Sequence, residues 1–285
     1  MGQSLFIVWR ESVEALLVIG ILYAWLRRQP DNRRALVLLW GGVGLGLVFS
    51  ALLALLILRA GEWLAGSAGE WFQAALVLVA SGLILQMVGW MHRHGRQLRD
   101  SLIAGANAGL SQRGGLGLLV LALIAVGREG SETVVFLYGI GAQQQGLDLG
   151  RFALGGLLGF VLAVATFAAL QLGSRLLSWR RFFQLSETLL LLLGAALLMA
   201  GLDRVSGQLM GMDLPEVAYS LLGEALWDSS ATLDDGSGVG AVLAGFTGYR
   251  AMPSPAAVGL MAAYWMLVWL WLWRPQPALA RVSPA

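Results

Sequence analysis

The sequence predicts an all-α polytopic membrane protein with seven transmembrane helices: an inverted repeat of three plus three helices, then one C-terminal helix. Of its 285 residues, 58% are hydrophobic and only 13% are charged, against about 25% charged in soluble domains. Seven apolar stretches are long enough to cross a hydrocarbon core, which takes about 20 helical residues. A charged motif, R-E-x-x-E, occurs in the first stretch and again in the fourth.

The seven spans are expected near residues 5–26, 35–58, 71–91, 116–141, 152–172, 182–202 and 256–273. The motifs lie in the first and fourth spans, so the helices that carry them must run in opposite directions. Transporters built from such inverted repeats bind their substrate near the membrane midplane. The chain is interpreted as one transmembrane domain, 1–285, with repeat one at about 5–91, repeat two at about 116–203, an outer acidic loop at about 204–255 and a last helix at about 256–273.

Arginine content predicts the orientation, because short arginine-rich loops stay on the cytoplasmic side. The loops after the first, third and fifth spans are arginine-rich, while the segment after the sixth is acidic. We therefore expect a multi-pass protein of the cytoplasmic (cell inner) membrane, with its N-terminus outside and its C-terminus in the cytoplasm. The arginines concerned are Arg27, Arg28, Arg33, Arg34, Arg93, Arg96, Arg99, Arg113, Arg175, Arg180 and Arg181.

Missing residue types exclude several functions. The chain has no cysteine, so thiolate metal sites, disulfides and cysteine nucleophiles are excluded. It has no H-E-x-x-H metalloprotease motif and no Glu-x-x-His pair of the kind found in di-iron bundles. No long basic tract is present for nucleic acid. An enzyme is therefore not expected, and the remaining classes are a transporter and a structural membrane subunit.

The repeated motif brings carboxylates together in pairs. At an offset of 118 residues, Trp9–Ala15 aligns with Gly127–Thr133. Residues three and four apart lie on one helix face, so each helix can present two glutamates side by side and pair its arginine with the second of them. The motif residues are Arg10, Glu11 and Glu14 in the first copy and Arg128, Glu129 and Glu132 in the second.

Such a cluster is expected to have a function. Six ionised groups at roughly 3 kcal/mol each within a membrane would cost about 18 kcal/mol, as much as or more than the stability of a typical fold. Four carboxylates make a hard, all-oxygen site that suits metal ions such as magnesium, calcium, manganese and high-valent iron. With two arginines the net charge is 2 negative, which a multivalent cation would neutralise. The alternative is that the groups only hold helices together through salt bridges.

The motifs resemble the paired R-E-G-x-E signatures of the high-affinity, oxidase-dependent iron permeases of yeast and bacteria. The resemblance implies a seven-span permease that takes up ferric iron through the motif glutamates. Arg10 and Arg128 are expected from their spacing to compensate the charge of these glutamates. The resemblance also implies that an extracytoplasmic ferroxidase or iron-binding protein delivers the ion, with iron as substrate and no permanently bound cofactor. Further shared features are Trp90-Met91, Trp227-Asp228-Ser229-Ser230, Gly248-Tyr249 and Pro253-Ser254.

Two departures from the family pattern concern the ion path. Ser12 occupies a position where the family usually has glycine, and this removes no ligand. Gln73 stands where the family has a glutamate; if it lies on the path, it can coordinate weakly but carries no charge. Carboxylates alone do not determine the ion, so lead, manganese and ferrous iron remain alternatives to ferric iron.

The outer segment is a second candidate for cation contact, because a field of one sign raises the local concentration of counter-ions. Asp228, Asp234 and Asp235 are the candidates for metal entry there. The alternative is an ordinary solvated loop, in which the Asp-Asp-Gly-Ser-Gly run at 234–238 only forms turns.

Overall fold

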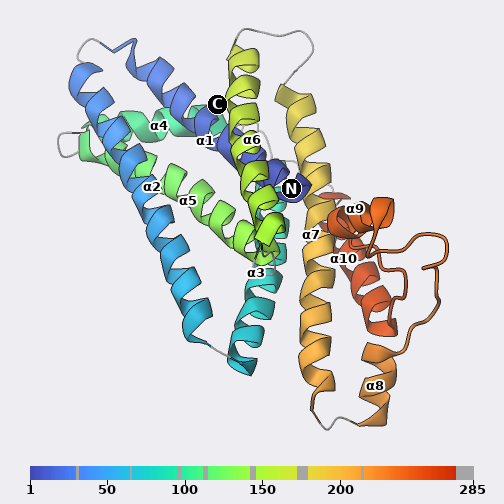
Figure 1. The fold of residues 1–285 in the computed structure, drawn as a ribbon. Helices are drawn as coiled ribbons and strands as arrows, with labels where there is room; N and C mark the ends of the chain where they lie inside the picture. Colours follow the sequence, from blue (N-terminus) through green and yellow to red (C-terminus); the bar gives the residue numbers. More distant parts are fainter. Residues whose placement is uncertain are drawn as a thin grey trace, which may run out of the picture.

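The computed structural model describes residues 1–29, 32–64, 66–94, 98–111, 115–141, 146–171, 179–212 and 215–273, and within these ranges the chain is helical without strands. The helices are α1 (Gly2–Leu26), α2 (Asn32–Trp63), α3 (Ser67–His94), α4 (Leu98–Ser111), α5 (Leu116–Gly141), α6 (Gly146–Gln171), α7 (Trp179–Met210), α8 (Glu216–Gly223), α9 (Gly238–Thr247) and α10 (Pro255–Trp273) (Figure 1).

Each predicted span falls on one long helix: α1, α2, α3, α5, α6, α7 and α10. Among the described residues, α2, α3, α6 and α7 are long and apolar enough to cross a membrane by length and composition. The helices α1 and α5 have similar lengths, 25 and 26 residues, but each contains the three charged residues of its motif. The chain is thus an all-helical, polytopic membrane protein. Its two motif helices are missed by a search for apolar spans, because each contains three charged residues.

Three helices fall in segments that the sequence interpretation left as loops. The helix α4 lies between the third and fourth predicted spans, and its buried Leu102 and Ala106 pack with α1 and α5. The outer segment contains α8 and α9, and its first residues belong to α7, which continues to Met210. The predicted outer acidic loop, at about 204–255, thus contains two short helices and the end of α7 in addition to turns.

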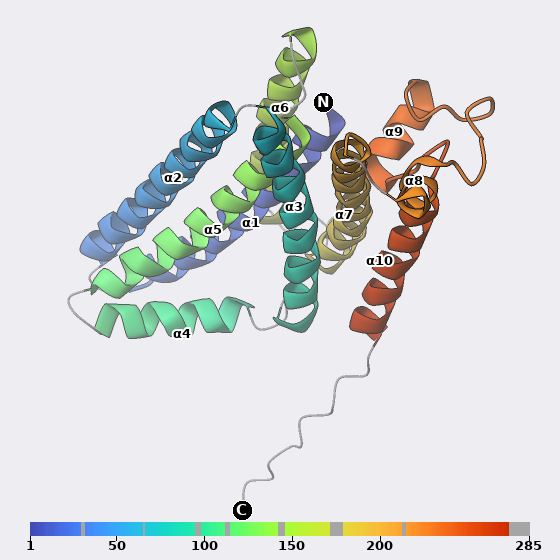
Figure 2. The ribbon, with the colours of Figure 1, turned by 90° about the horizontal axis from the view of Figure 1, so that it is seen from below.

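Glycines let two pairs of long helices pack closely. The helix α2 packs along α5 (Figure 2), and α1 packs against α6. A Cβ atom at Gly42 would lie 2.7 Å from the Cβ of Ala122 and would press on the carbonyl oxygen of Leu119. Small residues at helix contacts allow this approach between backbones. Both pairs run parallel, since later residues of one helix meet later residues of the other.

The same contacts recur in both pairs. Gly46 of α2 faces Leu123 O and Gly127 N of α5, and Gly159 of α6 faces Leu5 O and Trp9 N of α1. Leu5 and Trp9 precede Leu123 and Gly127 by 118 residues, which is the offset between the two motifs. The glycines themselves are 113 residues apart, as are Ser81 and Gly194, which share a hydrogen bond of 2.8 Å between α3 and α7.

We expect Gly42→Ala to weaken the α2–α5 contact, since extra atoms at a tight contact typically cost about 1–3 kcal/mol. Gly44→Ala is the matched control, because a Cβ there would meet no atom within 4 Å. Thermal unfolding of the purified variants in detergent measures the difference. An equal apparent midpoint for the two variants would contradict the close approach of the helices.

The two motif helices cross in opposite directions beside α3. Ile7, early in α1, shares a buried cluster with Phe136, late in α5, while Leu26, late in α1, shares another with Leu118, early in α5. This confirms the predicted antiparallel arrangement. Figure 2 shows α4 along one end of these helices, and α3 between them and the group of α7 and α10. The middle turns of α1 and α5, where the motifs lie, therefore meet in the interior.

Candidate cation-binding site in the membrane

The first motif is fully buried around Arg10. The Arg10 side chain has no exposed surface, and Glu11 is 1% exposed. The Nη1 atom of Arg10 lies 2.7 Å from Glu11 Oε1, and its Nη2 atom lies 2.6 Å from Glu14 Oε1. The pair with Glu14 is the one that the spacing of four residues predicts. The pair with Glu11 was not predicted, and it makes the arginine a bridge between both glutamates.

The second motif is more open. Arg128 Nε donates to Glu132 Oε1 at 2.9 Å, again at the predicted spacing of four residues. The Arg128 side chain is 38% exposed, and its guanidinium carbon lies 4.9 Å from the ring centre of Trp90 in α3, within the range of a cation–π contact. Glu129 and Glu132 are both buried.

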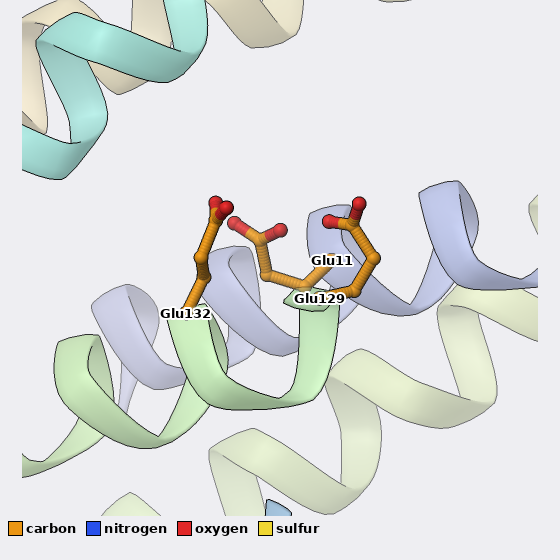
Figure 3. A group of neighbouring side chains, drawn as sticks. All are labelled: Glu11, Glu129 and Glu132. Atoms are coloured by element: carbon orange, nitrogen blue, oxygen red, sulfur yellow. The ribbon is translucent and has the colours of Figure 1, made fainter. Parts of the chain in front are cut away.

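Three glutamates from the two motif helices converge. Glu11 of α1 and Glu129 and Glu132 of α5 each offer a carboxylate oxygen, and these oxygens lie within 4.8 Å of one another (Figure 3). In each of the three, Oε2 is buried and has no hydrogen-bond partner. Small divalent ions bind carboxylate oxygens at about 2.0–2.2 Å, so opposite ligands are about 4.2 Å apart. The cluster needs to contract only slightly to hold such an ion.

Glu14 occupies a different position from the other three motif glutamates. It is paired with Arg10 and lies outside the group of three converging carboxylates. Together with Arg128 and Glu129 it lines a cavity of about 280 Å³, whose wall also includes Trp90 of α3 and Ser101 of α4. The carboxylate site therefore borders this cavity through Glu129, and Glu14 lies on the same cavity wall.

Gln73 lies at a separate place. It lines a larger cavity, about 510 Å³, together with Glu62 of α2 and Tyr138 of α5. None of the motif glutamates is among the described residues that line this cavity. The structure thus does not bring Gln73 together with the converging carboxylates. If Gln73 contacts the ion, it does so at a different point of the transport path.

The outer aspartates do not reach the cluster either. Asp228 accepts hydrogen bonds from the hydroxyl group and the backbone N–H of Ser230, which hold the pKa of Asp228 below its usual value. The backbone N–H of Gly236 similarly lowers the pKa of the exposed Asp234. Local turns of this kind use the carboxylates to organise the loop. Asp235 is partly exposed next to them.

Two groups of contacts escaped the sequence interpretation. Met87 and Met91 of α3 accept hydrogen bonds from Arg10, and Trp90 lies against Arg128. The glycine of the second motif, Gly130, packs so closely on Ser50 of α2 that a Cβ would lie 2.7 Å from the Cβ of Ser50. The spacing of four between the methionines indicates a shared helix face, but no local pattern indicates which helix that face meets.

Comparison with known proteins places this architecture in a family. The family model described as "Iron permease FTR1 family" matches residues 1–273. The chain belongs to the iron permease FTR1 family. Relatives named ferrous iron permease EfeU include one from Yersinia pestis, 26% identical over 274 residues, which cover 93% of this chain and 90% of the relative. One from Escherichia coli O157:H7 is 28% identical over 275 residues, which cover 93% and 92%. No solved structure matched.

Membership of this family makes the chain a permease and indicates iron as the transported ion. It agrees with the resemblance inferred from the two motifs. The converging glutamates are the part of the described fold in which buried, unpartnered carboxylate oxygens from both motif helices meet.

Proposed function

We propose that the protein moves iron across the membrane by binding it between Glu11, Glu129 and Glu132. One observation carries this proposal: three buried carboxylates from two antiparallel helices lie within 4.8 Å, each with an oxygen that lacks a partner. Buried carboxylates that only stabilise helices are expected to be fully paired. Iron is here the cargo of the site and not a resident cofactor.

Charge favours ferrous iron as the form that rests in the site. Four motif glutamates and two motif arginines sum to 2 negative, so a divalent ion leaves the cluster neutral, whereas a ferric ion leaves one positive charge buried. The names of the relatives, which specify ferrous iron, agree with this count. The motif resemblance instead implies ferric iron supplied by an extracytoplasmic ferroxidase or iron-binding partner, and this is the alternative that the transport test must separate.

Uptake into vesicles tests both parts of the proposal. The purified protein is reconstituted, and uptake of labelled ferrous iron, kept reduced, is compared with that of ferric iron, with manganese and lead as competitors. We expect saturable ferrous uptake that excess manganese or lead reduces only partly. Uptake of ferric iron alone would overturn the assignment of valence, and absence of iron uptake under any gradient would overturn the function.

We propose that the ion crosses by movement of two inverted repeats, 5–91 and 116–203, against each other. Support comes from the equivalent contacts of Gly46 and Gly159, because their partners in α5 and α1 differ by the 118 residues that separate the motifs. The cavity lined by Glu14 and Ser101 supports release toward α4. In this scheme seven helices span the membrane, with α10 added to the repeats.

The proposed orientation has the N-terminus outside and α4 on the cytoplasmic side. It is supported by Arg27 and Arg28 at the end of α1 and by Arg33 and Arg34 at the start of α2. The side chains of the other arginines behind this interpretation, from Arg93 to Arg113 and from Arg175 to Arg181, lie outside the described residues. The delivering partner would then meet the face that contains α8 and α9.

Because the chain lacks cysteine, single cysteines test the orientation directly. We expect a membrane-impermeant maleimide to label Val239→Cys, on α9, in intact cells. Ser101→Cys, in the wall of the cavity beside α4, is expected to react only after the membrane is permeabilised. The wild-type protein is the unlabelled control, and the opposite pattern would invert the proposed orientation.

A further inference from the structure

One turn of α3 contacts the guanidinium groups of both motifs. Met87 and Met91 are four residues apart and therefore share a helix face, and Trp90 lies between them. Both methionines are buried, with 2% and 8% exposure. We call these three residues of α3 the guanidinium dock.

The dock uses half of the terminal donors of Arg10. Nη1 lies 2.7 Å from Met87 Sδ as well as from Glu11 Oε1, and Nη2 lies 3.0 Å from Met91 Sδ as well as near Glu14 Oε1. Each terminal nitrogen carries two hydrogens. Nη1 donates to Glu11 Oε1 and to Met87 Sδ, while Nη2 donates to Met91 Sδ and forms an ion pair with Glu14, whose Oε1 accepts no hydrogen bond. Three of the four terminal hydrogens are thereby donated, and none of the three goes to Oε2 of Glu11 or to Glu129.

The second guanidinium is held on the same turn by a different contact. Arg128 donates from Nε to Glu132 Oε1, while its guanidinium carbon lies 4.9 Å from the ring centre of Trp90. The ring attracts the cation without accepting a conventional hydrogen bond. Both arginines thus remain beside the glutamates while the unpartnered oxygens of Glu11, Glu129 and Glu132 stay open.

We propose that Met87, Trp90 and Met91 are positioning residues that keep the two arginines from competing with iron for the carboxylate oxygens. The inference rests on the proposed function and specifies how the site stays available to its cargo. Without the thioethers, the buried N–H groups of Arg10 would lose two acceptors. A buried donor without a partner is unfavourable by about 1–3 kcal/mol, so the guanidinium would turn to the open carboxylate oxygens nearby and occupy them.

The test replaces the thioethers by a side chain of similar volume. We expect Met87→Leu and Met91→Leu, singly and together, to raise the iron concentration for half-maximal uptake, about tenfold in the double variant, with the maximal rate within about twofold of wild type. Leucine and methionine exchange with little loss of stability. Met199→Leu is the matched control, since Met199 is equally buried in α7, and it should leave both parameters unchanged.

The ring contact is tested in the same assay. Trp90→Phe keeps an aromatic face and should retain wild-type affinity, whereas Trp90→Leu removes it and should raise the half-maximal concentration. An unchanged half-maximal iron concentration in the methionine double variant would contradict the positioning role proposed for the guanidinium dock. So would an equal rise in Met199→Leu, or a fall in maximal rate alone.

Calorimetric titration of ferrous iron into the detergent-purified wild type and variants distinguishes failure of the guanidinium dock from failure of the proposed iron transport. If wild type binds iron but does not transport it, the proposed function fails, and the dock is judged by whether the methionine variants bind more weakly than Met199→Leu. If wild type transports iron and all variants match it in both assays, only the dock fails. If wild type neither binds nor transports iron, both are overturned.

Discussion

Glu129→Gln is expected to reduce iron uptake to the level of protein-free vesicles, and Glu11→Gln and Glu132→Gln are expected to do the same. Each change removes a negative charge from the three converging carboxylates while preserving the shape of the side chain. Two unit charges about 4 Å apart interact by about 4 kcal/mol at an effective dielectric constant of 20, and a divalent ion doubles this. A loss of even about 3 kcal/mol weakens binding more than a hundredfold.

Initial uptake rates in vesicles, normalised to folded protein, measure these losses. Glu216→Gln, on the exposed surface of α8, is the control for glutamate replacement as such. Glu14→Gln should retain partial uptake, about a tenth of wild type, because Glu14 is paired with Arg10 and lines the adjoining cavity. Wild-type rates for Glu129→Gln, or an equally complete loss for Glu14→Gln, would contradict the three-carboxylate site.

The sequence is informative about contacts within a helix. The spacing of four residues predicts the pairs of Arg10 with Glu14 and of Arg128 with Glu132, and both are present. The positions of the motifs in the first and fourth spans predict that the two helices are antiparallel, because consecutive spans run in opposite directions. These inferences depend only on helix geometry and on the membrane, and no knowledge of the packing between helices is needed.

Contacts between distant helices are not visible in the same way. The different position of Glu14 depends on how α1 is rotated relative to α5, and the contact of Arg10 with Met87 depends on the register of α1 against α3. Neither rotation nor register leaves a local pattern. The helix α4 did leave one, since Leu102 and Ala106 share a face, but its 14 residues are too few to span a membrane.

Arg10→Leu is expected to prevent accumulation of folded protein. The change leaves Glu11 and Glu14 without the cation that bridges them at 2.7 and 2.6 Å. Removal of one partner from a buried ion pair is unfavourable by about 3–5 kcal/mol, a large part of the total stability of a typical domain. Arg128→Leu should be milder, because the Arg128 side chain is 38% exposed and is paired with one glutamate, whereas Arg10 is paired with two.

A second change distinguishes lost charge balance from lost packing. Arg10→Leu combined with Glu14→Gln removes one of the stranded carboxylates, so the double variant should recover much of the monodisperse protein that the single variant loses. Size-exclusion chromatography in detergent measures this recovery for equal amounts of membrane. If Arg10 contributed only packing, Glu14→Gln would give no recovery.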